Sequence, residues 1–265
     1  MEAPVPVSLL PAPLPVPARR RRVRALLSLQ RRLEARRPVK RLLVPVPGAP
    51  RPYEIAVPAN PDGVLDELAR ALGAGSVPQR GGVEPYLPYW ATLWPSGLAL
   101  AEAVLQRRAQ VAGRRALELG CGLGVTAVAA LQAGARLAVA DCFAEALAYC
   151  RYNALVNTGA APRTLLADWR LDAGRRRLVR AGPFALVLAA DVLYEREDVE
   201  PLLALVPRLV APGGWFWLAE PGRATSAEFV RRAAAIGWRA ETVTQERDWP
   251  AGAGAARVTI HLYRR

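Results

Sequence analysis

The pattern of apolar positions changes near residue 113. From there on, short apolar runs alternate with longer segments whose apolar residues recur at helical spacing. Seven runs predict strands, at residues 116–119, 137–140, 164–167, 184–190, 215–219, 239–245 and 257–263. Helices are predicted at residues 125–133, 144–157, 199–210 and 226–236. Repeated strand–helix units of this length predict an α/β fold, a parallel sheet covered by helices, over residues 111–265.

The last two predicted strands have no helix between them. We therefore expect residues 239–245 and 257–263 to form an antiparallel hairpin at one edge of the sheet.

An N-terminal extension over residues 39–110 precedes this domain. Two apolar runs, residues 40–46 and 52–57, flank Gly48-Ala49-Pro50 and predict a hairpin. A helix is expected from Pro61 to Leu72, with Asn60 as its N-cap. An aromatic segment at residues 86–97 and a helical run from residue 98 to about 108 complete the extension.

Residues 1–38 are predicted to be a disordered Pro/Arg-rich tail. Alternating prolines in residues 1–18 remove backbone donors and favour extended geometry. Residues 19–37 are rich in arginine with interleaved leucines, a pattern that also fits a short basic amphipathic helix. We interpret residues 19–37 as part of a solvated tail.

The net charge of +13 is unevenly distributed. Eleven cations and two acids give residues 1–41 a charge of +9, whereas the remaining 224 residues carry +4. A strongly basic chain is typical of proteins with polyanionic partners. Because most of the excess lies in the tail, we expect nucleic-acid binding, if any, to involve the tail, and we do not favour it.

Cysteine usage and hydropathy restrict the class of protein. Cys121, Cys142 and Cys150 form neither a disulfide framework nor a zinc-type pair, so we expect a reducing compartment, the cytoplasm, and no metal site. The Arg-rich, acid-poor N-terminus also fits a mitochondrial transit peptide. No apolar run reaches 18 residues, so no membrane-spanning helix is expected.

A glycine-rich loop follows the first strand of the α/β domain. Gly120, Gly122 and Gly124 allow a tight turn and close approach of a ligand to the backbone. The dinucleotide fingerprint starting at Gly120 requires glycine or alanine at position 125, where Val125 stands. Glu118 before glycines at every second position is instead the pattern of S-adenosylmethionine sites. There Glu118 can meet the ammonium of the methionine moiety.

Acidic residues stand at the ends of the following strands. Asp141 lies about 20 residues after the loop, where a carboxylate binds the ribose hydroxyls. Asp168 is expected to bind the adenine amine and Trp169 to cover its ring, and Asp191 ends the fourth strand. Ligands bind at the carboxyl ends of strands in such sheets, so the acids predict one site. Each acid alone could instead cap the next helix.

Five segments carry a resemblance to a known family: PYWATLWPSG at 88–97, ELGCGLG at 118–124, AD at 140–141, ADW at 167–169 and DVLYE at 191–195. Over roughly residues 84–265 the chain resembles class I S-adenosylmethionine-dependent methyltransferases. More narrowly, it resembles the family-16 group of protein-lysine methyltransferases. Residues 220–223 (EPGR) look most like the branch that methylates the electron-transfer flavoprotein β-subunit.

The resemblance implies a Rossmann-like seven-strand fold, S-adenosylmethionine as cofactor and a lysine-bearing protein as partner. It places Trp94 and the Asp168–Trp169 pair against the cofactor. It also places Asp191 and Tyr194 of the D-x-x-Y motif beside the accepting amine as catalytic residues. We assign Trp90 and Glu220 to substrate binding.

The residue types suit methyl transfer to an amine. The reaction is an in-line displacement, helped mainly by holding donor and acceptor in place. Asp191 can orient the amine and accept its proton, directly or through water. Aromatic faces at Trp90, Trp94 and Tyr194 can attract the sulfonium or the alkyl stem of the amine.

Two other functions stay open. One is methylation of a small-molecule amine on the same fold, since the fold does not fix the acceptor. The other is a non-catalytic cofactor-binding protein that binds RNA through the basic tail. Methylation of a base amine is disfavoured, because Val192-Leu193-Tyr194 stands where a Pro-Pro-aromatic motif is usual. His261, the only histidine, is expected to be structural.

Overall fold

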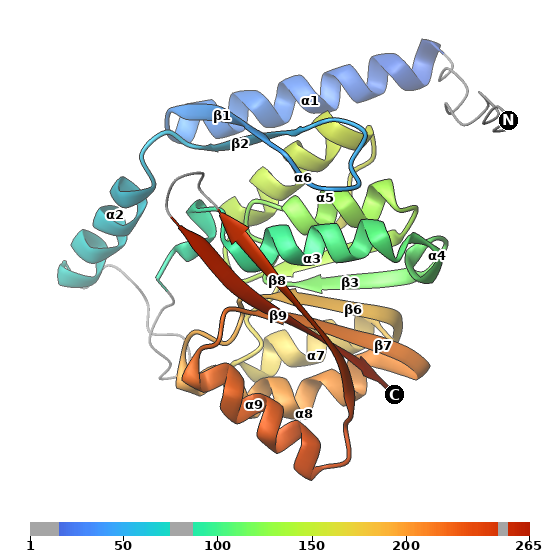
Figure 1. The fold of residues 1–265 in the computed structure, drawn as a ribbon. Coiled ribbons are helices and arrows are strands. Elements are labelled where there is room, and N and C mark those ends of the chain that lie inside the picture. Colours follow the sequence, from blue (N-terminus) through green and yellow to red (C-terminus); the bar gives the residue numbers. More distant parts are fainter. Residues whose placement is uncertain (1–15, 75–86, 249–253) are drawn as a thin grey trace, which may run out of the picture.

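The computed structural model describes residues 16–74, 87–248 and 254–265. A seven-stranded sheet forms the centre of the structure (Figure 1). Its strands are β3 (Arg115–Leu119), β4 (Arg136–Asp141), β5 (Arg163–Leu166), β6 (Phe184–Ala190), β7 (Val210–Glu220), β8 (Ala240–Asp248) and β9 (Ala255–Arg264). The spatial order is β5-β4-β3-β6-β7-β9-β8. The first five of these are parallel, and β9 runs antiparallel to β7 and β8. This arrangement confirms the predicted parallel sheet and the antiparallel hairpin at its edge.

Helices cover both faces of the sheet (Figure 1). One face carries α3 (Pro95–Gln106), α5 (Val125–Gln132) and α6 (Ala144–Thr158), and the other carries α7 (Asp172–Ala181), α8 (Val199–Leu209) and α9 (Ala224–Ala235). Along β3, Ala116 faces the first layer, whereas Leu117 and Leu119 face the second. Burial on both faces explains why the parallel strands are continuous apolar runs in the sequence.

The order of the strands creates a crevice beside β3. From β3 the chain moves outward through β4 to β5, and then returns to the other side of β3 with β6. Adjacent loops after β3 and β6 therefore leave the sheet in opposite directions, which is the switch point where α/β proteins bind ligands. The short helix α4 (Arg108–Val111) lies at the other end of β3, before it begins.

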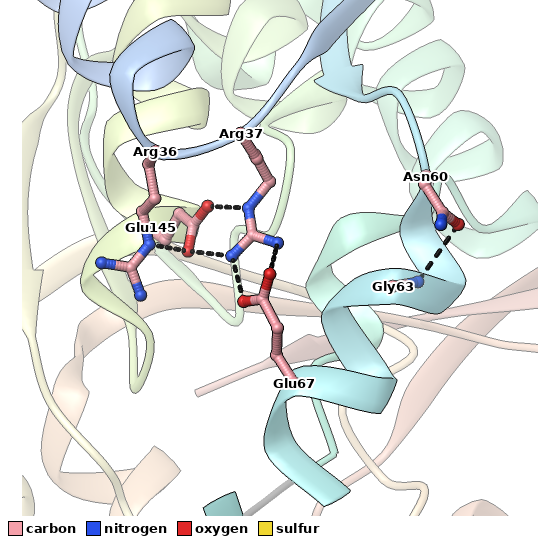
Figure 2. A network of polar contacts seen from close by, with 6 residues as sticks. All are labelled: Arg36, Arg37, Asn60, Gly63, Glu67 and Glu145. Atoms are coloured by element: carbon pink, nitrogen blue, oxygen red, sulfur yellow. Dashed lines mark hydrogen bonds and ion pairs between the residues drawn. The ribbon is translucent and has the colours of Figure 1, made fainter. Parts of the chain in front are cut away.

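The predicted hairpin and helix of the N-terminal extension are confirmed. Strands β1 (Val39–Val44) and β2 (Tyr53–Pro58) form an antiparallel pair, and α2 (Pro61–Gly73) follows. The Asn60 side chain accepts a hydrogen bond from the Gly63 backbone at 3.1 Å, as expected of an N-cap (Figure 2). The aromatic segment is described from residue 87, so Tyr86 lies outside the described residues.

Strand β2 is fastened to α6 by two asparagines. The Asn153 side chain accepts from the Ala56 amide at 2.8 Å and donates to the Ala56 carbonyl at 3.0 Å. The Asn157 side chain bonds to both backbone groups of Glu54 in the same way. Because buried backbone groups need partners, these bonds fix the hairpin on the α/β domain.

The prediction of a disordered tail is wrong for residues 16–38. Residues Val16–Arg36 form helix α1, which lies along α6 (Figure 1). Leu26, Leu29 and Leu33 recur at helical spacing and pack on the core, with Leu33 fully buried. The interleaved arginines hide this apolar stripe in the composition. Residues 1–15 lie outside the described residues.

Two arginines attach the C-terminal end of α1 to two other helices (Figure 2). Arg37 Nε lies 2.5 Å from Glu145 Oε1 on α6, and its Nη2 lies 3.1 Å from Glu67 Oε2 on α2. Arg36 also contacts Glu145, at 2.7 Å, but its side chain is 66% exposed against 9% for Arg37. Residues 16–38 thus belong to the folded body, while domain boundaries at residues 38 and 110 stay a prediction.

Helix α7 was not predicted. The pattern after residue 167 leads directly to the strand at 184–190, yet α7 lies between them. Its three consecutive arginines, residues 175–177, obscure an apolar side formed by Leu178 and Ala181. Among the residues that the structure describes, no helix has the length and apolar character needed to span a membrane.

Candidate active site

A cavity of about 330 Å³ opens at the carboxyl ends of β3, β4 and β6. Its wall brings together most of the predicted site residues, namely Trp90, Trp94, Glu118, Gly120, Gly122, Gly124, Asp141, Trp169, Asp191 and Tyr194. The predicted cofactor and acceptor residues therefore line the same cavity.

The glycine loop is packed too tightly for larger residues. Gly120 and Gly124 have φ values of 64° and 83°, in the region that favours glycine. A Cβ at Gly124 would lie 2.6 Å from the Cys150 sulfur and 2.9 Å from its Cα. A Cβ at Gly120 would lie 2.8 Å from a Val192 methyl group. The loop thus requires glycine both for its backbone and for its contact with α6.

We expect Gly124→Ala to destabilise the fold by about 2–4 kcal/mol, combining a left-handed backbone cost with overpacking. Gly113→Ala is the matched control, since Gly113 has a φ of 71° and nothing within 4 Å of an added Cβ. It should cost only about 1–2 kcal/mol. Urea unfolding of both variants measures the difference in the free energy of unfolding. Equal losses of this free energy would show that Cys150 moves aside at no cost.

Two carboxyl groups are buried in the cavity wall. Within the described residues, Glu118 Oε2 has no hydrogen-bond partner. Burial raises the pKa of Glu118 well above its ordinary value, and the nearby charge of Asp141 adds to the rise. Asp141 accepts from the Gly122 and Phe143 amides at 3.0 and 2.9 Å, yet burial still raises its pKa to about 6. Buried acids without a cation are costly, so this wall suits a positively charged ligand.

Aromatic rings form another part of the wall. The Trp94 indole donates to the Tyr89 carbonyl at 2.9 Å, and the two rings meet edge to face at 6.0 Å. Tyr89 meets Tyr194 in the same way at 5.3 Å. Burial raises the pKa of Tyr194 far above its ordinary value, so it remains a neutral phenol. Tyr89 was not predicted as a site residue, although it lies within the PYWATLWPSG segment.

Trp90 lines the cavity beside the glycine loop, and its assignment to substrate binding stays a prediction. It is buried, and its ring packs near Tyr149 and Phe143, at 5.5 and 6.4 Å between centroids. Its backbone also borders Gly122, where an added Cβ would lie 3.6 Å from the Trp90 carbonyl oxygen. The structure thus places Trp90 against the glycine loop.

Asp191 is held by an arginine that was not predicted. It follows β6 with a φ of 53°, a value that is uncommon outside glycine. Arg223 Nε lies 2.7 Å from Asp191 Oδ1, and Arg223 Nη2 lies 3.1 Å from Oδ2. This two-point pair sits in the cavity wall. The only signal for it in the sequence is the position of Arg223 three residues after the strand-end Glu220.

Comparison with known families decides the identity of this fold and site. The family model described as lysine methyltransferase matches residues 90–232, more than half of the chain. The chain belongs to this lysine methyltransferase family. Membership confirms the resemblance, the Rossmann-like methyltransferase fold and S-adenosylmethionine as the cofactor.

Several relatives carry more specific names. The chain is 34% identical over 139 residues to the electron transfer flavoprotein beta subunit lysine methyltransferase of Xenopus laevis, covering 52% of this chain and 54% of that protein. It is 26% identical over 178 residues to EEF1A lysine methyltransferase 3 of Mus musculus, covering 66% and 71%. It is 26% identical over 136 residues to the histone-arginine methyltransferase METTL23 of Mus musculus, covering 50% and 53%. The chain spans about half the length of the flavoprotein methyltransferases that it matches.

Solved structures support the fold. A methyltransferase structure from Pyrococcus horikoshii aligns with a TM-score of 0.51 at 15% identity, covering 77% of this chain and 98% of that one. At this identity the likeness shows the fold alone.

Asp168 and Glu220, two of the predicted site residues, do not line the cavity. Asp168 is held by Arg170, whose Nη2 lies 3.0 Å from Asp168 Oδ2, so its carboxylate is already paired. Trp169 does line the cavity, and its indole donates to Asp198 at 3.0 Å. That Asp168 binds the adenine amine stays a prediction.

Glu220 is likewise occupied elsewhere. Its carboxylate accepts from the Gly222 amide at 2.6 Å and lies 3.3 Å from His261 Nε2. Burial by itself raises the pKa of Glu220, but the bonds from His261 and Gly222 outweigh it and hold the pKa below its ordinary value. The assignment of Glu220 to substrate binding is not supported, and the contact gives His261 the structural place expected of it.

The wall fits S-adenosylmethionine, which carries a sulfonium and an ammonium. The unpartnered Glu118 oxygen offers the ammonium a counter-charge, and the glycine loop leaves room for close approach. Asp141 stands at the end of β4 in the cavity wall, and its carboxylate oxygens can accept from ribose hydroxyls. Trp169 supplies an apolar surface for the adenine.

We expect binding of this cofactor to release protons near pH 6. Positive charge favours ionised Glu118 and Asp141, whose raised pKa values mean that the free protein holds protons there. Affinity should fall by up to about tenfold per pH unit below pH 6. The free protein, in contrast, gains stability as the pH falls toward the ordinary carboxyl pKa, because its folded state binds more protons.

Titration calorimetry in buffers of different ionisation enthalpy measures this release. Asp141→Asn should reduce the number of protons released, and heats that are independent of the buffer in the original protein would contradict the prediction.

Proposed function

We propose that the chain transfers a methyl group from S-adenosylmethionine to the side-chain amine of a lysine in a protein substrate. The observation that carries the proposal is the single cavity, which joins the Glu118 wall to the Asp191–Tyr194 motif. Membership of a lysine methyltransferase family supports the same acceptor.

The chain contributes placement more than bond chemistry. When bound, the cofactor supplies an electrophilic methyl group on sulfur. Asp191 accepts a hydrogen bond from the amine and thereby directs the nitrogen lone pair, while the neutral phenol of Tyr194 and the ring of Tyr89 border the alkyl stem. The bound cofactor would give up its methyl group to the nitrogen that Asp191 orients, keeping the electron pair of the broken S–C bond on sulfur. The methylated ammonium then loses its proton to water.

Labelling with a tritiated methyl donor tests the proposal. We expect a labelled protein band in a cognate lysate that disappears when lysines are blocked beforehand. Purified electron-transfer flavoprotein β-subunit is a suitable first substrate, because the relatives from Xenopus laevis and Rattus norvegicus are named as lysine methyltransferases of that subunit. Label confined to small molecules would instead support the small-molecule alternative. No label in any acceptor would favour the non-catalytic alternative.

We also propose a reducing compartment, the cytoplasm, on the basis of free Cys121, Cys142 and Cys150. Contact with nucleic acid is not favoured, because Arg22, Arg36 and Arg37 of the basic segment are engaged within the protein itself.

A further inference from the structure

Arg223 has a special position in the cavity. Of the described residues that line it, Arg223 alone carries a positive side chain. Its side chain is 38% exposed, whereas that of its partner Asp191 is 7% exposed. The guanidinium donates one hydrogen bond to each Asp191 oxygen, a geometry specific to arginine.

The backbone on both sides holds this pair in place. The Asp191 amide donates to the Ala219 carbonyl at 2.9 Å, which joins the end of β6 to β7. The Thr225 hydroxyl donates to the Leu193 carbonyl and joins the start of α9 to the D-x-x-Y segment. Arg223 lies between these two attachments, so its position relative to Asp191 is set by the fold.

A carboxylate alone would be a poor acceptor site for lysine. A nearby negative charge stabilises the protonated amine, which has no lone pair for attack. A carboxylate paired with arginine differs, because the pair has no net charge. Two of its roughly four lone pairs remain free, so it can still accept an N–H bond. The guanidinium also disfavours a second positive charge beside it.

We propose that Arg223 is a positioning residue of the acceptor site, which neutralises Asp191 so that the carboxylate receives the uncharged lysine amine in place of the ammonium. This role rests on the proposed function. The lysine releases its proton to water as it enters, and the transfer step itself is unchanged.

The other charged and titratable groups around the pair do not replace Arg223. Tyr89 and Tyr194 are phenols, and Arg170 is committed to Asp168. Cys121 and Cys142 also line the wall, but burial raises the pKa of both, so they stay neutral thiols. The remaining groups in or behind the wall are the acids Glu118, Asp141, Glu195 and Glu220, of which Glu220 is paired with His261. Without Arg223, the cavity would therefore favour the protonated amine.

The test compares Arg223→Gln and Arg223→Lys with the original protein in methyl transfer from a tritiated donor. All three act on the same lysine acceptor, from about pH 6.5 to 10. For Arg223→Gln, we expect the rising limb of kcat, which reports ionisations in the enzyme–substrate complex, to move up by at least about one pH unit. The loss should be about tenfold at pH 7.5 and should largely disappear at the highest pH. Arg223→Lys keeps the charge and should retain the original limb with a lower plateau.

Arg232→Gln is the matched control. Arg232 also lies on the α9 segment, is 36% exposed and pairs with the exposed Glu200, so its loss should leave the profile unchanged. Binding of S-adenosylhomocysteine, measured by calorimetry, shows that each variant is folded. If Arg223→Gln fails to bind S-adenosylhomocysteine, the position of the rising limb in the pH profile of Arg223→Lys tests the role of Arg223 instead.

The outcomes separate the two proposals. An equal loss at every pH, or no loss, contradicts the role of Arg223 while lysine labelling by the original protein upholds the proposed function. Absence of lysine labelling by the original protein overturns the proposed function and this role with it.

Discussion

Asp191→Asn should lower methyl transfer by about 10²-fold, the scale expected when a reacting group loses its orientation. Asparagine has the same shape and tolerates the φ of 53° found at this position. It loses the charge that binds Arg223 and offers the amine one acceptor oxygen in place of two. Initial rates with a tritiated donor measure the loss, and affinity for S-adenosylhomocysteine should stay within about threefold.

Glu200→Gln provides the comparison for this variant. Glu200 is also an acid paired with an arginine, but its side chain is 70% exposed and lies on α8 outside the cavity wall. Its replacement should leave the rate unchanged. If Asp191→Asn retains more than about a third of the original rate, the acceptor site has been placed wrongly.

Arg37→Ala should destabilise the protein by about 3 kcal/mol, the lower end of the range for breaking a buried ion pair. The side chain of Glu145 is 12% exposed and would lose its buried partner, while Glu67 is half exposed and would regain water. Arg36→Ala is the control, because Arg36 contacts the same Glu145 from an exposed position. An exposed pair contributes only about 0–1 kcal/mol.

Urea unfolding at pH 7 distinguishes the two arginines. Equal losses of unfolding free energy, or a loss below about 0.5 kcal/mol for Arg37→Ala, would show that the network in Figure 2 contributes little to stability.

Glu145 lies two residues after Phe143, which lines the cavity. We therefore expect Arg37→Ala to weaken cofactor binding as well.

The sheet and the cofactor loop were predictable because their signals are local. Each parallel strand is a short apolar run, and Glu118, Asp141 and Asp191 stand at the ends of such runs. The glycine spacing reflects backbone angles that few other residues adopt. In such cases, residues close together in the chain determine the structure.

The features that the sequence analysis missed depend on contacts between residues that are far apart in the chain. Helix α1 depends on three leucines that meet the core only after α6 has folded beneath them. Arg223 meets Asp191 only because β6 and β7 are neighbours in the sheet, a fact that no local pattern contains.

The attachment of β2 to α6 has a consequence for where substitutions in this chain can act. The family match begins at residue 90, yet Tyr53, Ile55 and Val57 of β2 are buried in the same core as α5 and α6. The packed core is thus larger than the shared family segment. Changes in the hairpin or in α1 can reach α6 through Asn153 and Glu145 while every catalytic motif stays the same. The N-terminal part of this chain can therefore affect the cofactor site without any change in the residues that line it.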